Sequence, residues 1–478
     1  MPVTELLSMR SDISLNTQNE GDYTFNGPRF SFTINAVSSG IGSALSELFT
    51  GNKTQEQLIE IVSNKDGFFA IPQFMFLLQS LFQNGIVCQS FWSDNRQLAT
   101  VVPIAPQIQK PKNAFQIDSQ YVLSRFALLH SEDACLVLES PLSQVKVILH
   151  SLPVLALFMA LAKPRLGKEL YELKESLSDE DVNILVSIMI NANFILETDI
   201  NGHCWETESS DAAQWEFHDL LFHSRTRLGR HNQGYGGTMR FIGKFEPLPA
   251  LKPQMSDKIV CLDKPDLKAV IASDSPFTTV LEQRKSIRTH GKNPISKAQL
   301  SEFLYRVARV REVFQTEWDE VSNRPYPGGG AIYELEIYPV IHQCTGLDSG
   351  LYHYRPGDHE LCQIADMSHD VENVLKLAQL ISVSDAKPQV LLVLTARFSR
   401  LSWKYQSVVY ALILKHVGVL YQSMYLVATA MGLAPCALGG GDSDLFAQAS
   451  GLDYLAEGAV GEFILGSLSE ANGSNSSE

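Results

Sequence analysis

An apolar stretch near the C-terminal end places the strongest constraint on how this chain can fold. Residues 405–432 are mostly apolar over 28 residues, long enough for a helix that crosses a bilayer. Lys415 and His416 lie in the middle of the stretch, where a charge inside a bilayer is costly. A helix that is hydrophobic nearly all round is more often a buried core or dimer-interface helix. The sequence therefore predicts such a helix here, and no membrane span.

Length, charge and cysteine content limit the class of protein. The chain has 478 residues, which suggests about three domains. Its 38 basic and 53 acidic side chains give a net charge of -15, which argues against nucleic acid as the partner. The seven cysteines are scattered without a Cys-x-x-Cys pair, so neither a zinc site nor a disulfide framework is indicated. No signal peptide is visible at the N-terminus, and the chain is expected to be cytoplasmic.

The first hundred residues predict the element order of a winged helix. Strands are expected over residues 23–25 and 30–34, which alternate apolar and polar side chains around an Asn-Gly-Pro turn. Three helices are expected over 39–48, 54–62 and 72–84, and a returning strand over 85–91. Thr54 and Gln57 have the spacing of a capping box. This order predicts a winged-helix-like domain over residues 1–106.

The same order recurs after a polar, proline-containing linker at residues 107–114. The expected elements are a hairpin (121–130 with 135–140), three helices (146–162, 168–174 and 179–191) and a strand (194–198). Pro153 is expected to bend or restart the first of these helices. The recurrence predicts a second winged-helix-like domain over residues 107–214.

Winged helices often bind DNA, but the third helix of each predicted domain is poorly suited to it. The helix over residues 72–84 has no Arg or Lys, and the one over residues 179–191 begins with Asp-Glu-Asp. Neither can neutralise phosphates. Peptide binding is favoured instead, with an extended peptide adding to a hairpin edge and a helix forming the other wall of the groove.

Residues 215–255 are predicted to connect the domains. Three histidines and three arginines lie between residues 216 and 231. His218 and His223 are five residues apart, so they do not stack on one helical face as a metal-binding pair would. A polar connecting segment is favoured over a metal site, and no metal is expected.

Helices and strands alternate through the rest of the chain, which predicts an α+β domain over residues 256–468. The expected helices are 296–307, 371–380 and 405–432, and the expected strands are 331–341, 350–354, 389–395 and 461–466. Residues 469–478 are rich in Ser, Asn and Gly and are expected to form a disordered tail.

Three segments of this domain predict a site for a flat, phosphorylated cofactor. Arg284 and Arg288 offer planar donor forks that match a phosphate, and Ser286 between them can donate to a ring carbonyl. An exposed helix end with ordinary surface charges is the alternative. Glycines at residues 328–330, and a further glycine run after Leu438, let backbone pass close to a flat ligand. No Gly-x-Gly-x-x-Gly motif opens a βαβ unit, which disfavours a dinucleotide site.

These three segments, in this order, resemble the nitroreductase superfamily of FMN enzymes. The resemblance implies a nitroreductase-like FMN domain preceded by the two winged-helix-like domains. In that family the Arg-x-Ser-x-Arg segment grips the ribityl phosphate and the pyrimidine edge of the flavin, and a later backbone segment faces the ring near N5. The implied FMN-binding residues are Arg284, Ser286, Arg288, Pro327, Gly328, Gly329, Leu438, Gly439 and Gly440. Family members are domain-swapped homodimers, which suits an apolar helix over residues 405–432.

Lys404 and Tyr405 resemble the Lys-Tyr pair of the azoline dehydrogenases of the SagB/McbC type, and the connector is also similar to theirs. Within that family the chain is most similar to the cyanobactin oxidases. The resemblance implies oxidation of thiazolines and oxazolines to thiazoles and oxazoles in a precursor peptide, with hydride passing to FMN N5 and oxygen reoxidising the flavin. It also implies that the winged-helix-like domains hold the leader sequence of that peptide.

The same resemblance implies the catalytic roles. Lys404 is the predicted base or base-assisting group, because burial can leave a lysine uncharged, and Tyr405 would orient it or bind the substrate. A surface lysine at a helix start is the alternative for Lys404. For the whole chain, the alternatives are an NAD(P)H-dependent nitro- or quinone reductase, and a non-catalytic peptide-binding scaffold of a modifying complex.

Overall fold

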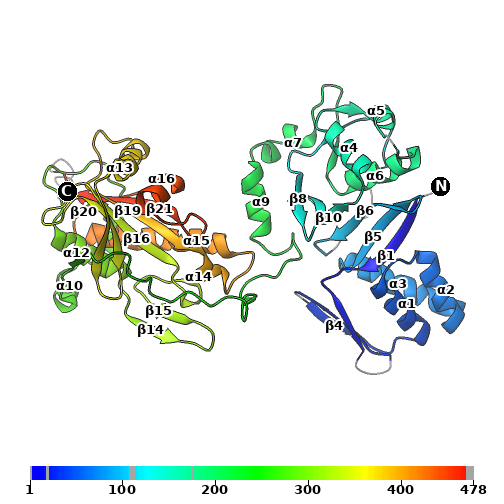
Figure 1. The fold of residues 1–478 in the computed structure, drawn as a ribbon, viewed down its shortest axis with the longest axis horizontal. Coiled ribbons are helices and arrows are strands. Elements are labelled where there is room, and N and C mark those ends of the chain that lie inside the picture. The colour runs from blue at the N-terminus through cyan, green and yellow to red at the C-terminus, as the bar shows by residue number, and fades with distance from the viewer. Residues whose placement is uncertain (1–2, 18–20, 29, 107–113, 175, 470–478) are drawn as a thin grey trace. The chain divides into compact units, whose positions relative to one another are not determined.

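The chain consists of two units, Met1–Tyr235 and Gly236–Glu478. The computed structural model describes residues 3–17, 21–28, 30–106, 114–174 and 176–469. Of the predicted linker at residues 107–114 and the predicted tail at 469–478, all but residues 114 and 469 lie outside the described residues. Figure 1 labels the elements of both units, each of which is described by itself.

The first winged-helix module has the predicted strands and helices. Its sheet has the order β2 (Ser14–Thr17), β3 (Tyr23–Gly27) and β4 (Phe30–Ile34), and its helices are α1 (Ser39–Thr50), α2 (Gln55–Asp66) and α3 (Ile71–Gln83). The predicted capping box opens α2, since Thr54 Oγ1 accepts from Gln57 N at 3.2 Å and Gln57 Oε1 accepts from Thr54 N at 2.9 Å. Leu45, Leu58 and Leu78, one from each helix, are buried in the module's core.

One six-stranded antiparallel sheet runs through both winged-helix modules, which the sequence did not predict. Its order is β1 (Thr4–Met9), β5 (Val87–Ser93), β6 (Arg96–Pro103), β10 (Val145–Leu149), β9 (Cys135–Glu139) and β8 (Leu128–Glu132). The first three strands precede the predicted linker and the last three follow it. Strands β6 and β10 therefore join the two modules through backbone hydrogen bonds.

The second module differs from the prediction in its strands. A separate sheet has the order β11 (Arg165–Leu166), β7 (Gln120–Leu123) and β12 (Ile195–Thr198), and the helices are α4 (Leu152–Ala160), α5 (Gly167–Glu172) and α6 (Asp179–Asn191). The strand predicted over residues 121–130 is therefore split. Its first part forms β7, and only its last part reaches β8, which pairs with β9 in the hairpin.

The helix predicted over residues 146–162 was wrong in its first part. Val145, Val147 and Leu149 are buried while the residues between them are half-buried, and this alternation belongs to strand β10. Helix α4 starts only at Leu152, with Pro153 in its first turn, where the missing backbone N–H needs no partner. Of the two effects predicted for Pro153, a restart is the one seen.

Three short helices lead out of the second module: α7 (Trp205–Glu208), α8 (Ser210–Ala213) and α9 (Phe217–Arg225). Two arginines of the predicted connector bind this module. Arg225 Nη2 pairs with Glu139 Oε2 at 2.9 Å, and Arg230 Nη1 donates to Pro141 O at 3.2 Å. The first part of the connector is thus fixed to the module that precedes it.

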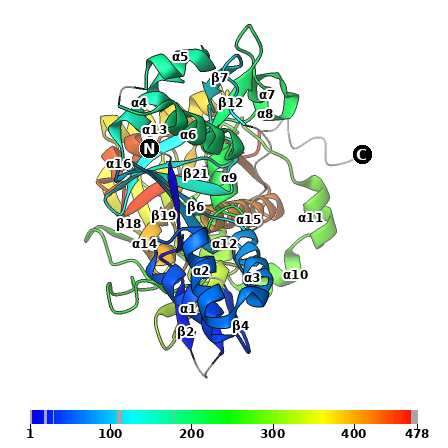
Figure 2. The ribbon, with the colours of Figure 1, turned by 90° about the vertical axis from the view of Figure 1, so that its right-hand side faces the viewer.

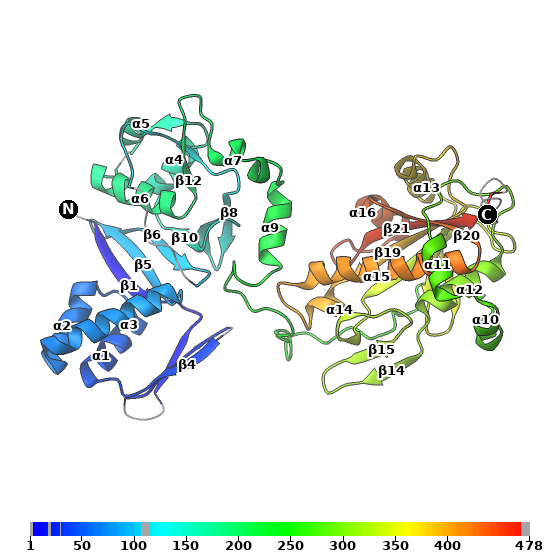
Figure 3. The same cartoon turned by 180° about the vertical axis from the view of Figure 1, so that it is seen from behind.

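The second unit is an α+β domain, as predicted, built on a seven-stranded antiparallel sheet. Its order is β13 (Ile259–Cys261), β18 (Glu360–Asp366), β17 (Gly350–Arg355), β16 (Leu335–Ile341), β19 (Val390–Arg397), β21 (Glu457–Ser467) and β20 (Leu433–Leu438). Helices α12 (Lys297–Ala308) and α15 (Val409–Ala430) pack with one face, and α13 (His369–Ser382) and α16 (Ser443–Ser450) with the other. Figure 3 shows α15 lying along the sheet. The remaining elements are α10 (Leu267–Ser273), α11 (Phe277–Gln283), α14 (Phe398–Ser402), and the hairpin of β14 (Glu312–Gln315) with β15 (Glu320–Asn323).

Two predicted elements of this unit begin later than expected, because left-handed residues precede them. Gly330, Ala331 and Tyr333 have φ of 62°, 57° and 51°, so the strand predicted from residue 331 begins at Leu335 as β16. Ser407 has φ of 64°, and the helix predicted from residue 405 begins at Val409 as α15.

Helix α15 is buried on one side only. It is long and apolar enough to cross a membrane, and the described residues contain one such helix. His416, Leu420 and Met424 are buried, whereas Leu414 on another side is 42% exposed. One side of the helix thus belongs to the core, and another side, with Tyr410, Leu414, Lys415, Gly418 and Gln422, stays exposed in the single chain.

Candidate functional site

The segment Arg284–Arg288 follows α11 and lies against α15 and the edge strand β20. Ser286 Oγ is 2.8 Å from the hydroxyl of Tyr425 on α15, and Ile287 N donates to Pro435 O on β20 at 2.8 Å. The guanidinium carbon of Arg284 lies 5.2 Å from the centre of the Tyr425 ring. Arg284 is half-buried and Arg288 is exposed, so both guanidinium groups remain within reach of a phosphate.

The hydrogen bonds of Tyr425 leave the proton of Ser286 free for a ligand. Ala437 N donates to the Tyr425 oxygen at 2.8 Å, so the phenol proton is available to Ser286 Oγ. Ser286 then accepts that bond and can donate its own proton outward. This arrangement fits the predicted role of Ser286 toward a ring carbonyl.

The glycine segment at residues 328–330 is held by a buried histidine. Gly329 N donates to His416 Nε2 at 2.8 Å, and His416 Nδ1 lies 2.7 Å from Glu334 Oε1. His416 is 6% exposed and Glu334 is fully buried, so the pair is shielded from water. In the sequence, His416 was informative only as evidence against a membrane span. A histidine in the middle of an apolar helix was the available signal for this role.

Tyr405 lies beside the same glycine segment. A Cβ atom at Gly330 would be 2.6 Å from the Tyr405 hydroxyl, and Gly330 has φ of 62°, so both space and backbone favour glycine. Tyr405 is half-buried, and burial, with Asp319 nearby, raises the pKa of its phenol. The hydroxyl therefore keeps its proton at neutral pH.

Lys404 precedes Tyr405 at the end of α14 and pairs with a buried carboxylate. Its Nζ is 3.9 Å from Asp319 Oδ2, and the two side chains are 19% and 3% exposed. The backbone of the pair is tied to the start of the unit, because Met239 N donates to Lys404 O at 3.0 Å. The structure thus gathers Lys404, Tyr405 and the glycine segment in one place.

The third predicted segment, Leu438–Gly440, closes strand β20. A Cβ atom at Gly439 or Gly440 would meet nothing within 4 Å, whereas one at Gly441 would lie 2.0 Å from Glu462 Oε1. A side chain at Gly441 would therefore have to displace the Glu462 carboxylate, whereas Gly439 and Gly440 present bare backbone to open space. Burial raises the pKa of Glu462 to about 7, and the sequence did not single this residue out.

Two of the three predicted cofactor segments lie against different turns of α15. Ser286 contacts Tyr425 and Gly329 contacts His416, nine residues earlier, which is about 14 Å along a helix. Among the described residues, no hydrogen bond or ion pair links the Arg284–Arg288 segment to Lys404 or Tyr405. In a single chain the site therefore has two separate walls, one formed by the Arg284–Arg288 segment and the other by the glycine segment with Lys404 and Tyr405.

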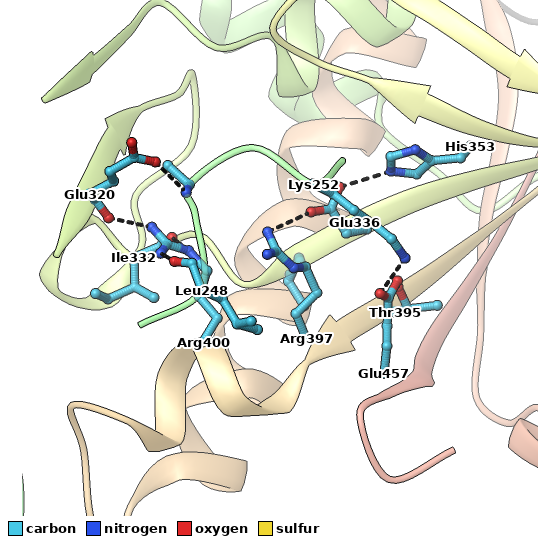
Figure 4. A network of polar contacts seen from close by, with 12 residues as sticks. Leu248, Lys252, Glu320, Ile332, Glu336, His353, Thr395, Arg397, Arg400 and Glu457 are labelled. Carbon is cyan, nitrogen blue, oxygen red and sulfur yellow. Dashed lines mark hydrogen bonds and ion pairs between the residues drawn. The ribbon is translucent and has the colours of Figure 1, made fainter. Parts of the chain in front are cut away.

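Arg400 anchors the wall that carries Tyr405 (Figure 4). Its guanidinium donates to Ile332 O at 2.9 Å, Leu248 O at 2.5 Å and Glu320 O at 2.6 Å. Burial lowers the pKa of Arg400 to about 10, and the group still carries its charge at neutral pH. One side chain thus fixes the backbone after the glycine segment, the entry to the unit and strand β15.

A second buried network lies beside it on strands β16, β17 and β19 (Figure 4). Glu336 Oε2 is 3.1 Å from His353 Nε2, and Glu336 Oε1 is 3.4 Å from Arg397 Nη1. Burial alone would raise the pKa of Glu336, but His353 and the arginines hold it at about 2. This carboxylate is charged at all working pH values and is a structural support.

Three family models match the chain. Residues 1–110 match the ThcOx helix turn helix domain, residues 121–232 match the cyanobactin oxidase ThcOx, and residues 281–467 match the nitroreductase family. The matches fall on the first winged-helix module, the second module with the start of the connector, and the unit that holds the site.

Three curated relatives are similar to parts of the chain. The nitroreductase-family protein MJ1384 of Methanocaldococcus jannaschii is 29% identical over 37% of this chain and 81% of its own length. The microcin B17-processing protein McbC of Escherichia coli is 31% identical over 23% of this chain and 42% of its own length. The trifolitoxin-processing protein TfxB of Rhizobium leguminosarum is 24% identical over 34% of this chain and 44% of its own length. The chain thus spans less than half the length of the two peptide-processing relatives.

Proposed function

Because this chain belongs to the nitroreductase superfamily, as an oxidoreductase of the SagB/McbC type, we propose that it oxidises azoline rings in a ribosomally made peptide. Thiazolines and oxazolines would become thiazoles and oxazoles during maturation of a cyanobactin-like product. The observation that carries this proposal is the Lys404–Tyr405 pair, in which Tyr405 lies against Gly330 and Lys404 pairs with Asp319. The names of the family match over residues 121–232 and of two peptide-processing relatives support the choice of substrate.

The cofactor of this proposal is FMN, and the residues fit it. Arg284 and Arg288 would hold the phosphate, Ser286 would donate to the ring, and Gly439 and Gly440 would leave room for its flat face. Pro327, Gly328, Gly329 and Leu438 complete the proposed FMN-binding residues. When bound, FMN supplies the hydride acceptor at N5, and oxygen would regenerate it.

The protein's own part in the reaction is to take a proton. An azoline that becomes aromatic loses a hydride from one ring carbon and a proton from its neighbour. Tyr405 keeps its proton at neutral pH and would therefore orient the ring by donating a hydrogen bond. Lys404 can accept the proton only while its amine is uncharged, and Asp319 would then stabilise the ammonium that results.

A homodimer would complete the proposed site. The two walls lie about 14 Å apart on α15, and the uncovered side of that helix includes Leu414, Gly418 and Gln422. If two copies pack these sides together, the Arg284–Arg288 wall of one copy can face the Tyr405 wall of the other. An interface at α15 would also cover the exposed side chains of Tyr410 and Leu414.

The leader sequence of the precursor would bind the first winged-helix module. Strand β4 is an edge strand, and Phe30 and Phe32 on it line a cavity of about 320 Å³ with Asn84 and Ile86. An extended leader segment could add to the β4 edge and place its side chains in this cavity.

The proposal is tested by mass spectrometry of a thiazoline-containing peptide after incubation with the purified, flavin-loaded chain. Loss of two hydrogens per ring is expected, and the Lys404→Ala variant should keep its flavin but lose turnover. Consumption of NAD(P)H with a nitroaromatic compound, without azoline oxidation, would identify a reductase instead. A purified chain that binds no flavin would refute the catalytic proposal and favour a peptide-binding scaffold.

A further inference from the structure

A groove crosses the face of the six-stranded sheet between the third helices of the two winged-helix modules. It has a volume of about 860 Å³, within the range of sites that bind small ligands or short peptide segments. Its walls come from α3 and α6, and its floor from β1, β5, β6 and the start of β10. Helices α3 and α6 lie on either side of β6 in Figure 2, and Figure 3 shows the same order. The groove is thus distinct from the edge of β4.

Carboxamide and apolar side chains line this groove in equal number, eight of each. Eight of its twenty lining residues are Asn or Gln, and two are charged. Gln79 and Gln83 on α3 and Gln144 before β10 form no side-chain hydrogen bond to any residue that the structure describes. A carboxamide offers both a donor and an acceptor, which is the pattern that a peptide unit presents in return. Such a mixed lining suits an extended, uncharged peptide better than an ion, because its main chain can bond to the carboxamides and its side chains can pack on the apolar residues.

The two charged residues lie on opposite sides of the groove. Glu5 is on the edge strand β1, where its Oε1 accepts from Gln89 Nε2 at 2.7 Å. Arg230 donates to Pro141 O, close to the start of β10, three strands away from β1. Three strand spacings are about 14 Å, which about four residues of extended peptide would span. The charges therefore define a direction for a bound chain.

We propose that this groove binds a short extended segment of the precursor peptide. The segment has about four uncharged residues, with a basic side chain toward Glu5 and an acidic side chain or carboxylate toward Arg230. The identity of the peptide rests on the proposed function, whereas the peptide class follows from the lining. Helices α3 and α6, one from each winged-helix module, would then bind one segment of the substrate between them. The β4 edge would bind another segment of the same substrate.

Fluorescence anisotropy with the full chain tests this site. The probe is a fluorescein-labelled model precursor peptide in which a lysine and an aspartate flank four uncharged residues, titrated with wild-type protein and two tryptophan variants. Gln79→Trp fills the groove from α3, and Gln73→Trp places the same side chain on an exposed position of α3 outside the groove. We expect at least about tenfold weaker binding for Gln79→Trp and wild-type binding for Gln73→Trp. The double variant Gln79→Ala, Gln83→Ala should weaken binding by about tenfold through lost hydrogen bonds.

The outcomes separate this proposal from the proposed function. Unchanged affinity of Gln79→Trp, or no binding of the precursor to the wild type, overturns the groove, whatever the enzyme does to a thiazoline. Loss of binding in Gln79→Trp with a short thiazoline compound still oxidised supports the groove and the reaction together. If Gln79→Trp weakens binding but no azoline is oxidised, the groove proposal is supported and the proposed reaction is refuted. Equal melting temperatures of the two tryptophan variants exclude misfolding as the cause.

Discussion

Replacing Gly330 by alanine isolates the contact between the glycine segment and Tyr405. Gly330 and Gly432 have φ of 62° and 65°, so alanine costs the backbone a similar amount, about 1 kcal/mol, at either position. A Cβ atom at Gly432 would meet nothing within 4 Å, whereas one at Gly330 would lie 2.6 Å from the Tyr405 hydroxyl. Gly432→Ala is therefore a matched control for the backbone effect.

The size of the effect follows from the displacement that the contact demands. An ordinary contact begins at 3.4 Å, so the Tyr405 hydroxyl must move by about 0.8 Å. A misplacement of about 1 Å in a catalytic group can lower the rate about a hundredfold. We expect Gly330→Ala to lower kcat for azoline oxidation by about 10- to 100-fold, and Gly432→Ala to leave it unchanged.

Mass spectrometry of the oxidised peptide gives kcat, and flavin absorbance gives the loaded fraction. The effect of Gly330→Ala should nearly vanish when Tyr405→Phe is already present, because the hydroxyl that clashes is then gone. Equal kcat values for Gly330→Ala and Gly432→Ala would refute the view that this glycine segment positions Tyr405.

Three other residues of the site give predictions of their own. Ser286→Ala should weaken FMN binding by about 2- to 12-fold, measured by flavin retention on dialysis, because it removes one outward donor; unchanged retention would contradict a contact with the ring. His416→Leu should lower the free energy of unfolding by about 3 kcal/mol or more, because it leaves the buried Glu334 carboxylate without its partner. Adding Glu334→Leu should restore much of the lost stability. Calorimetry of the single and double variants measures both effects, and additive losses would contradict the pairing of His416 with Glu334. Burial raises the pKa of Glu462 from 4.5 to about 7, so the folded state holds a proton that the unfolded state releases. The free energy of unfolding should therefore fall as pH rises from about 4.5 through 7. Glu462→Gln should remove this part of the pH dependence of the melting temperature, and an unaltered pH dependence would contradict the prediction.

The sequence predicted local elements well where a single period or cap decides them. The capping box at Thr54 and the helix over residues 179–191 depend on neighbours in the chain, and both were found as predicted. The strand at residues 145–149 was missed because an apolar run continues beyond it into α4, and the change of period occurs at Pro153. Local patterns do not contain the pairing of β6 with β10, which joins residues far apart in the chain.

The candidate site shows the same limit. The residue types within a single segment such as Arg284–Arg288 indicate which ligand groups it can bind, so such segments could be predicted from the sequence. The supports of the site come from other elements, since His416 reaches Gly329 and Tyr425 reaches Ser286 from one helix. Nothing within a few residues of the glycine segment signals these partners. Glu462 on β21 packs against Gly441, which follows the neighbouring strand β20, and local sequence patterns could not predict this contact either.

The shared six-stranded sheet has a consequence for the order of folding during synthesis. Strand β6 is complete when Pro103 has left the ribosome, but its partner β10 ends at Leu149. Until then the nascent first module carries an open strand edge with a run of buried-type residues, Leu98 to Pro103, that can pair with other chains. The first module therefore cannot reach its final state alone, and a truncated chain that ends at residue 106 should aggregate where one that ends at Tyr235 folds. The two modules repeat one order of elements along the chain, yet one sheet joins them, and they are expected to unfold together.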